Sequence, residues 1–365
     1  MLTLLKNLEC YCPEYIGKND ILICGSKIYK IEPKIECYDD GLINRIYDFS
    51  GYFAFPGLVD QHLHFIGGGG EQGFASRIPE IEVGEIVKTG ISTAVGVLGA
   101  DGVSKTLESL YAKAKGLQLQ GLTTYIYGGS YSMPPVTITG DVTRDFVFID
   151  KVIGIKTALS DFRSSNAGDD QLIKIASKAL LGGMVSGKAG IVHIHMGDGK
   201  KGLSTLLEVL ENTDLPINQF VVTHMNRSNN LFFQAKNFLK LGGNIDFTAG
   251  EVEGVSVPDA ISSLLGEGID MSNVTISSDG NAGLPNGGTS CVGALYEDIK
   301  SCIVNKGIRP EISFCPATKN AAKALKLYPR KGTLKMGSDA DILVTDSSFN
   351  IVKLFCMGNI SFERI

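Results

Sequence analysis

The chain has 365 residues, with 34 Lys and Arg against 39 Asp and Glu, which gives a formal net charge of −5. This mild acidity and the lack of basic runs argue against nucleic acid or an anionic membrane surface as a partner. No apolar run reaches the ~18 residues that a membrane span requires, and the residues after Met1 become polar too soon for a signal peptide. We therefore expect a cytoplasmic protein whose eight cysteines are reduced thiols.

The two ends of the chain are rich in predicted strands. Residues 20–29 contain two β-rich runs separated by a Gly-Ser turn, and similar runs recur from residue 331 onward. At about 150 residues per domain, the length suits two domains, or one α/β barrel with an appendage. We predict one small β domain formed by residues 1–55 and 330–365, and a larger central domain over residues 56–329.

The central region repeats a short apolar run eight times. Steps of roughly 30 residues between the runs match one strand plus one return helix. The segments between them have helical spacing, as at Leu107, Leu110, Tyr111 and Ala114. Eight such units are what a closed (β/α)8 barrel of the α/β class requires, and an open doubly wound sheet is the alternative. The runs end at residues 64, 98, 127, 156, 195, 224, 248 and 279.

All five histidines of the chain lie on these predicted strands. Functional residues of such barrels gather at the carboxyl ends of the strands. His62 and His64 differ by two positions, so both imidazoles point to the same side of the strand, as suits a divalent transition metal. In the fifth run we expect His195 to be a ligand, and His193 to lie one layer deeper, in the core or behind the ligands. His224 ends the sixth run.

Lys156 ends the fourth run, and Asp279 ends the eighth. Burial at the inner end of a strand would lower the pKa of the lysine and favour its neutral amine. A neutral amine can react with CO₂ to form a carbamate, an anionic ligand able to bridge two metals. The alternative is an exposed lysine that simply ends a strand.

These residues, and the stretches around them, resemble the amidohydrolase superfamily and, within it, the isoaspartyl dipeptidase family. The resemblance extends over almost the whole chain and implies a (β/α)8 TIM barrel with a small β-sandwich domain formed by both chain ends. Residues 337–344 resemble the strand that completes this sandwich. The most specific stretches are residues 60–71, 137–140, 152–156, 195–198 and 277–281.

The resemblance also implies two zinc ions per chain, bridged by a carbamate on Lys156 and a hydroxide. Two dications would lower the pKa of the bridging water and polarise the scissile carbonyl. Asp279 would accept the proton of that water and pass it to the leaving amine. The implied ligands are His62, His64 and Asp279 for one ion, His195 and His224 for the other, and carboxylated Lys156 for both.

Substrate contacts are implied in the same way. Gly69 would belong to the substrate site, because its glycine loop lets the backbone approach the ligand closely. Glu71, which follows that loop, would pair with the α-amino group of the substrate. Arg163 and Arg227 would bind carboxylates, because a guanidinium offers two donors to two oxygens. Tyr131 would donate its phenol to the developing oxyanion. The alternative for each is an ordinary loop residue.

The expected function is that of a metallo-dipeptidase that cleaves the isopeptide bond of β-aspartyl dipeptides. A cyclic-amide hydrolase of the dihydroorotase or hydantoinase type is an alternative, although dihydroorotases typically carry an arginine where this chain has Ile66. A non-catalytic scaffold, which would have lost ligands, is a second alternative. Gly283 and Ala100 replace residues that can carry hydroxyl groups in relatives, which leaves finer substrate contacts open. A homo-oligomer, an octamer, is implied by the resemblance only.

Overall fold

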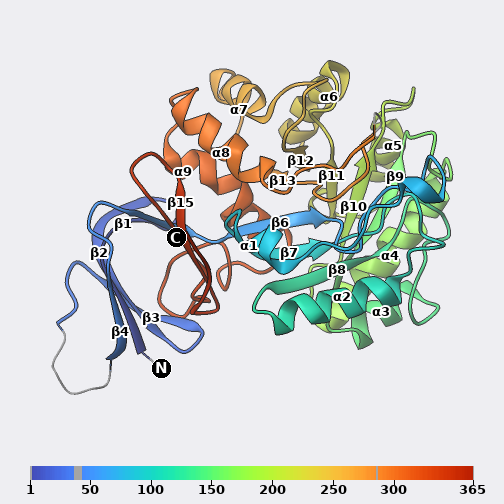
Figure 1. The fold of residues 1–365 in the computed structure, drawn as a ribbon. Helices are drawn as coiled ribbons and strands as arrows, with labels where there is room; N and C mark the ends of the chain where they lie inside the picture. The colour runs from blue at the N-terminus through green and yellow to red at the C-terminus, as the bar shows by residue number, and fades with distance from the viewer. Residues whose placement is uncertain (1, 37–42, 285–286, 365) are drawn as a thin grey trace.

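Eight parallel strands form the central part of the chain (Figure 1). A computed structural model describes residues 2–36, 43–284 and 287–364, and in it these strands neighbour one another in chain order. A parallel bridge between Leu63 and Gly280 joins the first strand to the segment after the last, so the sheet closes as the predicted barrel. The strands are β6 (Leu58–Leu63), β7 (Ile91–Gly96), β8 (Thr123–Gly129), β9 (Val152–Leu159), β10 (Ile191–Met196), β11 (Phe220–Thr223), β12 (Asn244–Thr248) and β13 (Val274–Ser277).

Helices cover the outside of the barrel (Figure 1). Several begin at a side chain that accepts a hydrogen bond from the main-chain N–H three residues on, as at Thr106 and Ser256. Among the described residues, no helix has both the length and the apolar character needed to cross a membrane. The helices are α1 (Val83–Val87), α2 (Leu107–Leu119), α3 (Val142–Phe148), α4 (Asp169–Ser186), α5 (Ser204–Asn212), α6 (Asn229–Lys240), α7 (Val257–Gly266), α8 (Ala294–Val304), α9 (Pro310–Phe314) and α10 (Lys319–Ala324), with 3-10 turns at Phe74–Ser76, Ile217–Gln219 and Cys315–Ala317.

The two chain ends form a second, mixed sheet beside the barrel (Figure 1). Its strand order is β16-β15-β14-β5-β1-β2-β3, with β4 also paired to β1, and the antiparallel β14–β5 pair joins the two ends. The seven cysteines among the described residues are free thiols, and Cys37 lies outside those residues. The strands are β1 (Leu2–Tyr11), β2 (Tyr15–Cys24), β3 (Lys27–Glu32), β4 (Ile43–Asp48), β5 (Phe53–Pro56), β14 (Ile342–Thr345), β15 (Ile351–Cys356) and β16 (Asn359–Glu363).

A buried lysine connects this sheet to the barrel. The Nζ of Lys331 lies 2.6 Å from Oδ2 of Asp341 and 2.9 Å from Oδ2 of Asp339. It also donates to Oγ1 of Thr123, the first residue of β8, at 2.8 Å. The charged groups are nearly fully buried, so the pairing and the hydrogen bonds must offset the cost of removing them from water.

Candidate metal and substrate site

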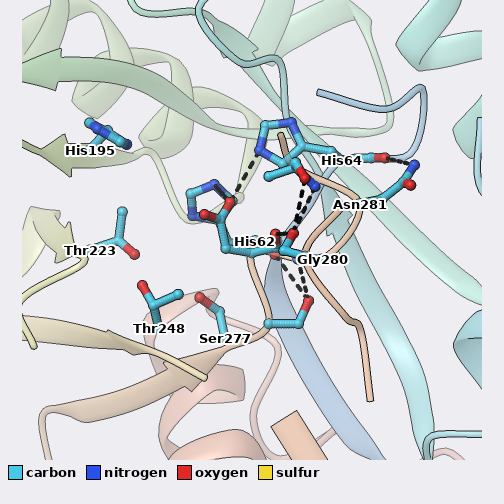
Figure 2. A network of polar contacts seen from close by, with 12 residues as sticks. His62, His64, His195, Thr223, Thr248, Ser277, Gly280 and Asn281 are labelled. Carbon is cyan, nitrogen blue, oxygen red and sulfur yellow. Dashed lines mark hydrogen bonds and ion pairs between the residues drawn. The ribbon is translucent and has the colours of Figure 1, made fainter. Parts of the chain in front are cut away.

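Six side chains from five barrel strands, or from the residues just after them, meet at one end of the barrel. The ring centres of His195 and His224 lie 4.4 Å apart, and those of His62 and His224 lie 5.2 Å apart. Figure 2 shows His62 and His64 next to each other, with His195 on a separate strand. The six residues are the candidate ligands from the sequence: His62, His64, Lys156, His195, His224 and Asp279.

Lys156 lies inside its strand, whereas the sequence pattern placed it at the end. β9 continues to Leu159 because its last residues pair with the end of β10. Lys156 is therefore in register with His193, below the mouth of the barrel. Its long side chain still reaches the site, with Nζ 2.8 Å from Nε2 of His62. Burial lowers the pKa of Lys156 to about 7, so much of the amine is neutral near neutral pH.

Asp279 lies against both histidines of the first barrel strand. Its Oδ1 is 3.1 Å from Nε2 of His62 and 3.2 Å from Nε2 of His64. Burial lowers the pKa of both imidazoles, which favours the neutral, metal-binding form. Asp279 and His224 both adopt left-handed backbone conformations, with φ of 45° and 67°. Such conformations are unfavourable for residues other than glycine and gather at functional sites.

Two of the imidazoles are held from behind by another side chain. Nδ1 of His224 is 2.6 Å from Oγ1 of Thr248, and Nδ1 of His62 is 3.0 Å from Nε2 of His193. Each contact occupies one ring nitrogen and directs the other toward the centre of the site. Nε2 of His224 is buried and has no hydrogen-bond partner within the described part of the chain. A partner on one nitrogen and an open second nitrogen are typical of metal-binding histidines.

His195 differs from these two, because both of its ring nitrogens have a side-chain partner. One of the partners is Asp161. Its Oδ2 is 2.9 Å from Nε2 of His195, and Nδ1 of that ring is 2.6 Å from the hydroxyl of Tyr131. Arg163 binds the same carboxylate with Nε and Nη2, at 3.0 and 2.8 Å. Burial raises the pKa of Asp161, but these hydrogen bonds outweigh burial and hold the pKa well below its usual range. Asp161 is not among the residues predicted from the sequence, although its place two residues after β9 was a usable signal.

The donor set is of the kind that binds divalent metal ions such as zinc. It offers four imidazoles, one carboxylate and an amine able to carry a carbamate, which are nitrogen and oxygen ligands that zinc accepts. Among the described residues, His62, His224 and Asp279 have ligand atoms within 4.8 Å of one another, and so do His62, His193 and Asp246. Asp246 already accepts four side-chain hydrogen bonds, so the first group is the better metal site.

The structure brings the predicted substrate residues to the edge of this set. The guanidinium of Arg163 lies 5.4 Å from the ring centre of Tyr131, and its Nη1 is 3.6 Å from Oε1 of Glu71. Nη1 of Arg227 is 3.4 Å from Nε2 of His195. The Arg163 and Glu71 side chains are 27% and 34% exposed, so solutes can reach both.

Gly69 shapes the loop that leads to Glu71. Its φ is +76°, and an added Cβ would collide with the main-chain oxygen of Ser76, so the loop requires glycine at this position. A Cβ at Gly283 would lie 3.0 Å from Cα of Gly69. The absence of a side chain at Gly283 therefore lets the two segments pack closely.

The comparisons with known proteins agree with this geometry. A sequence profile of the Amidohydrolase family matches residues 254–361. The chain is similar to the crystal structure of beta-aspartyl dipeptidase from Fervidobacterium islandicum AW-1 in complex with beta-Asp-Leu dipeptide. That similarity has 41% sequence identity and a TM-score of 0.93, and it covers 100% of this chain and 97% of the other.

Two curated relatives match over shorter stretches. N-acetylglucosamine-6-phosphate deacetylase from Bacillus subtilis is 40% identical over 45 residues, which are 12% of this chain and 11% of the deacetylase. Dihydroorotase from Lactobacillus johnsonii is 26% identical over 234 residues, which are 59% of this chain and 49% of the dihydroorotase. The chain thus spans half or less of the length of these two relatives.

Proposed function

The chain belongs to the amidohydrolase family and, within it, to the beta-aspartyl dipeptidases, and on this basis we propose that it is a zinc-dependent hydrolase of β-aspartyl dipeptides. The observation that carries the proposal is the placement of Glu71, Arg163 and Arg227 beside a converging set of metal-binding side chains. A β-aspartyl dipeptide carries one free ammonium group and two free carboxylates. One glutamate and two arginines match those three charges.

Zinc would be held by the six candidate ligands, with a carbamate on Lys156 between two ions. Bound zinc supplies Lewis acidity, which polarises a carbonyl and lowers the pKa of water. The pKa of about 7 for Lys156 supports the carbamate, because only the neutral amine reacts with CO₂. His62, His64 and Asp279 would bind one ion, and His195 and His224 the other.

Asp279 and Tyr131 would assist the breaking of the amide C–N bond. The Asp279 carboxylate, 3.1 and 3.2 Å from two buried imidazoles, would accept a proton from the attacking water and return it to the leaving amine. Burial raises the pKa of Tyr131 well above its ordinary value, so its hydroxyl stays protonated. It would donate a hydrogen bond to the oxygen that becomes negative in the transition state.

The arginines and Glu71 would orient the substrate. Arg163 and Glu71 lie 3.6 Å apart, so a carboxylate and an ammonium group on the same aspartyl residue could meet them together. A cyclic-amide hydrolase is the alternative that the dihydroorotase match favours. Ile66, however, is buried in the hydrophobic core and offers no charge at the position where dihydroorotases typically carry arginine.

Initial rates on three substrates test the proposal. With zinc-loaded protein, we expect β-Asp-Leu to be hydrolysed at least about tenfold faster than α-Asp-Leu or dihydroorotate. Removal of zinc by a chelator should abolish the activity, and added zinc should restore it. Equal or faster turnover of α-Asp-Leu or dihydroorotate would contradict the substrate assignment. Full activity without metal would contradict the zinc dependence.

A further inference from the structure

Lys105 is a buried lysine outside the proposed chemistry. It immediately precedes Thr106, the N-cap of α2, and is only 6% exposed. Its Nζ lies within hydrogen-bond distance of four main-chain carbonyl oxygens. They belong to Ile66 (2.7 Å), Gly67 (2.6 Å), Gly68 (3.1 Å) and Ile78 (2.8 Å).

These four oxygens form a cradle for a cation. An ammonium group has three N–H donors, so it can satisfy three of the carbonyls while its charge attracts the fourth. Burying a charge without such partners is costly. Conversely, four carbonyl oxygens that face one point without a cation between them would repel one another. The cradle and the ammonium are therefore stable only together.

The cradle joins the two ends of one loop. Ile66, Gly67 and Gly68 begin the loop that follows β6, and Ile78 lies near its end, with Glu71 between them. The main-chain N–H of Ile78 also donates to the Gly68 carbonyl at 3.1 Å. A Cβ on Gly67 would collide with the Ile78 carbonyl, so the two ends are packed closely.

We propose that Lys105 is a positioning residue for substrate recognition, whose ammonium is the internal cation around which residues 66–78 fold and which keeps Glu71 at the mouth of the barrel. Only one part of this inference, the role of Glu71 in binding substrate, rests on the proposed function. The cradle itself depends only on the four carbonyl contacts. Lys105 touches no substrate in this proposal and acts through the loop.

An external cation should be able to replace the lysine. A cavity of about 370 Å³ is lined by Lys105 together with Arg77, Ile78 and Glu80, among others. Removing the lysine side chain would extend this cavity to the carbonyl cradle. A small primary ammonium ion could then enter and donate to the same oxygens, as the lysine amine does.

The first test separates charge from volume in the metal-loaded enzyme. Lys105→Met keeps most of the side-chain volume and removes the charge. We expect KM for β-Asp-Leu to rise about tenfold or more, with kcat changed less than about threefold and zinc content unchanged. Lys113→Met is the matched control, because Lys113 is on α2, the helix that follows Lys105, and pairs with Glu80 at 3.2 Å. It should leave KM and kcat as they are.

A double variant tests whether Lys105 acts through Glu71. If it does, Glu71→Gln combined with Lys105→Met should raise KM no more than Glu71→Gln alone, within about twofold. A KM increase in the double variant equal to the product of the two single-variant increases would contradict the proposal. So would an unchanged KM in Lys105→Met.

Hydrogen exchange without substrate tests the cradle independently of the activity. In Lys105→Ala, the amides of residues 66–78 should exchange at least about tenfold faster than in the wild type. Propylammonium chloride should restore protection in this variant, whereas tetramethylammonium chloride, which has no N–H, should not. If the amides of residues 66–78 exchange at the wild-type rate in Lys105→Ala, or if the two salts have equal effects, Lys105 does not hold the loop through the cradle. If the wild type does not hydrolyse β-Asp-Leu, the proposed function fails while this experiment still decides the role of Lys105.

Discussion

The site has two halves that are built differently. The metal-binding half is carried on barrel strands or the residues directly after them, and its imidazoles and Lys156 are almost fully buried. The substrate half lies on longer loops, and Arg163 and Glu71 are 27% and 34% exposed. The barrel topology fixes the first half, whereas contacts within and between loops hold the second. The proposed metal centre is therefore fixed by the barrel itself, and substrate preference can change by altering the loops around it.

The largest expected effect follows from replacing Lys156 in the metal-binding half. Lys156→Ala removes the amine that would carry the carbamate, so we expect activity below detection and less than one zinc ion per chain. Metal analysis and β-Asp-Leu hydrolysis measure both effects. Lys151→Met is the matched control, because Lys151 is another buried lysine, and it donates to the Thr124 carbonyl outside the site at 2.8 Å. Full zinc content in Lys156→Ala would contradict a bridging carbamate.

Asp279→Asn should affect turnover more than metal binding. The amide can still offer an oxygen to the metal, but it cannot accept the proton of the attacking water. We expect kcat to fall about 10³-fold, within the range for loss of a general acid–base group, while zinc stays bound. Single-turnover rates combined with metal analysis measure this. Near-normal turnover would refute the proton transfer by Asp279.

The sequence predicted the convergence of the candidate metal ligands because its signals are local. Strand periodicity and spacing placed His62, His64, His195 and His224 at one end of a barrel. The end of β9 was misplaced, because pairing with β10 extends that strand beyond Lys156. That pairing is long-range and leaves no local pattern in the sequence.

The outer contacts of the site could not be predicted from the sequence. Thr248 supports His224 from 24 residues away, and Lys105 meets the Ile66 carbonyl from 39 residues away. Nothing in the local pattern distinguishes these residues from other polar residues at strand ends or helix starts. Asp161 is the exception, since it follows a barrel strand. Its contact with Arg163 is also local, but its contact with His195, 34 residues away, still required the fold.

Asp161 connects the two halves, so its replacement tests how independent they are. Asp161→Asn keeps the shape but weakens the hydrogen bonds to His195 and Arg163. We expect zinc affinity to fall about 10- to 100-fold, as for other partners of metal-binding histidines, and KM to rise at saturating zinc. Chelator competition and steady-state kinetics measure the two effects separately. If only the zinc affinity or only KM changes, Asp161 contributes to one half of the site alone.

The smallest expected effect on activity comes from Lys331, which lies away from both halves. Lys331→Met removes the ammonium that pairs with the buried Asp339 and Asp341 carboxylates, and it leaves Asp339 paired with Lys27 at 2.6 Å. Removing one partner of a buried pair typically costs about 3–5 kcal/mol, and the remaining Lys27 pair reduces that cost. We expect a lower unfolding midpoint at neutral pH, with kcat and KM unchanged below that midpoint.

The stability difference between Lys331→Met and the wild type should depend on pH in a definite direction. In the wild type, burial raises the pKa of Asp339, but the ammonium groups of Lys331 and Lys27 together outweigh burial, so the folded pKa lies below its ordinary value. Its contribution to stability is thus present above the unfolded pKa and is lost as the pH falls through the folded pKa. In Lys331→Met, Lys27 and the more distant Arg330 remain to oppose burial, so the pKa of Asp339 is higher than in the wild type and the carboxylate is protonated at a higher pH. The stability difference between variant and wild type should therefore shrink as the pH falls from 7 toward about 4. A constant difference would mean that Lys331 stabilises the interface by packing alone.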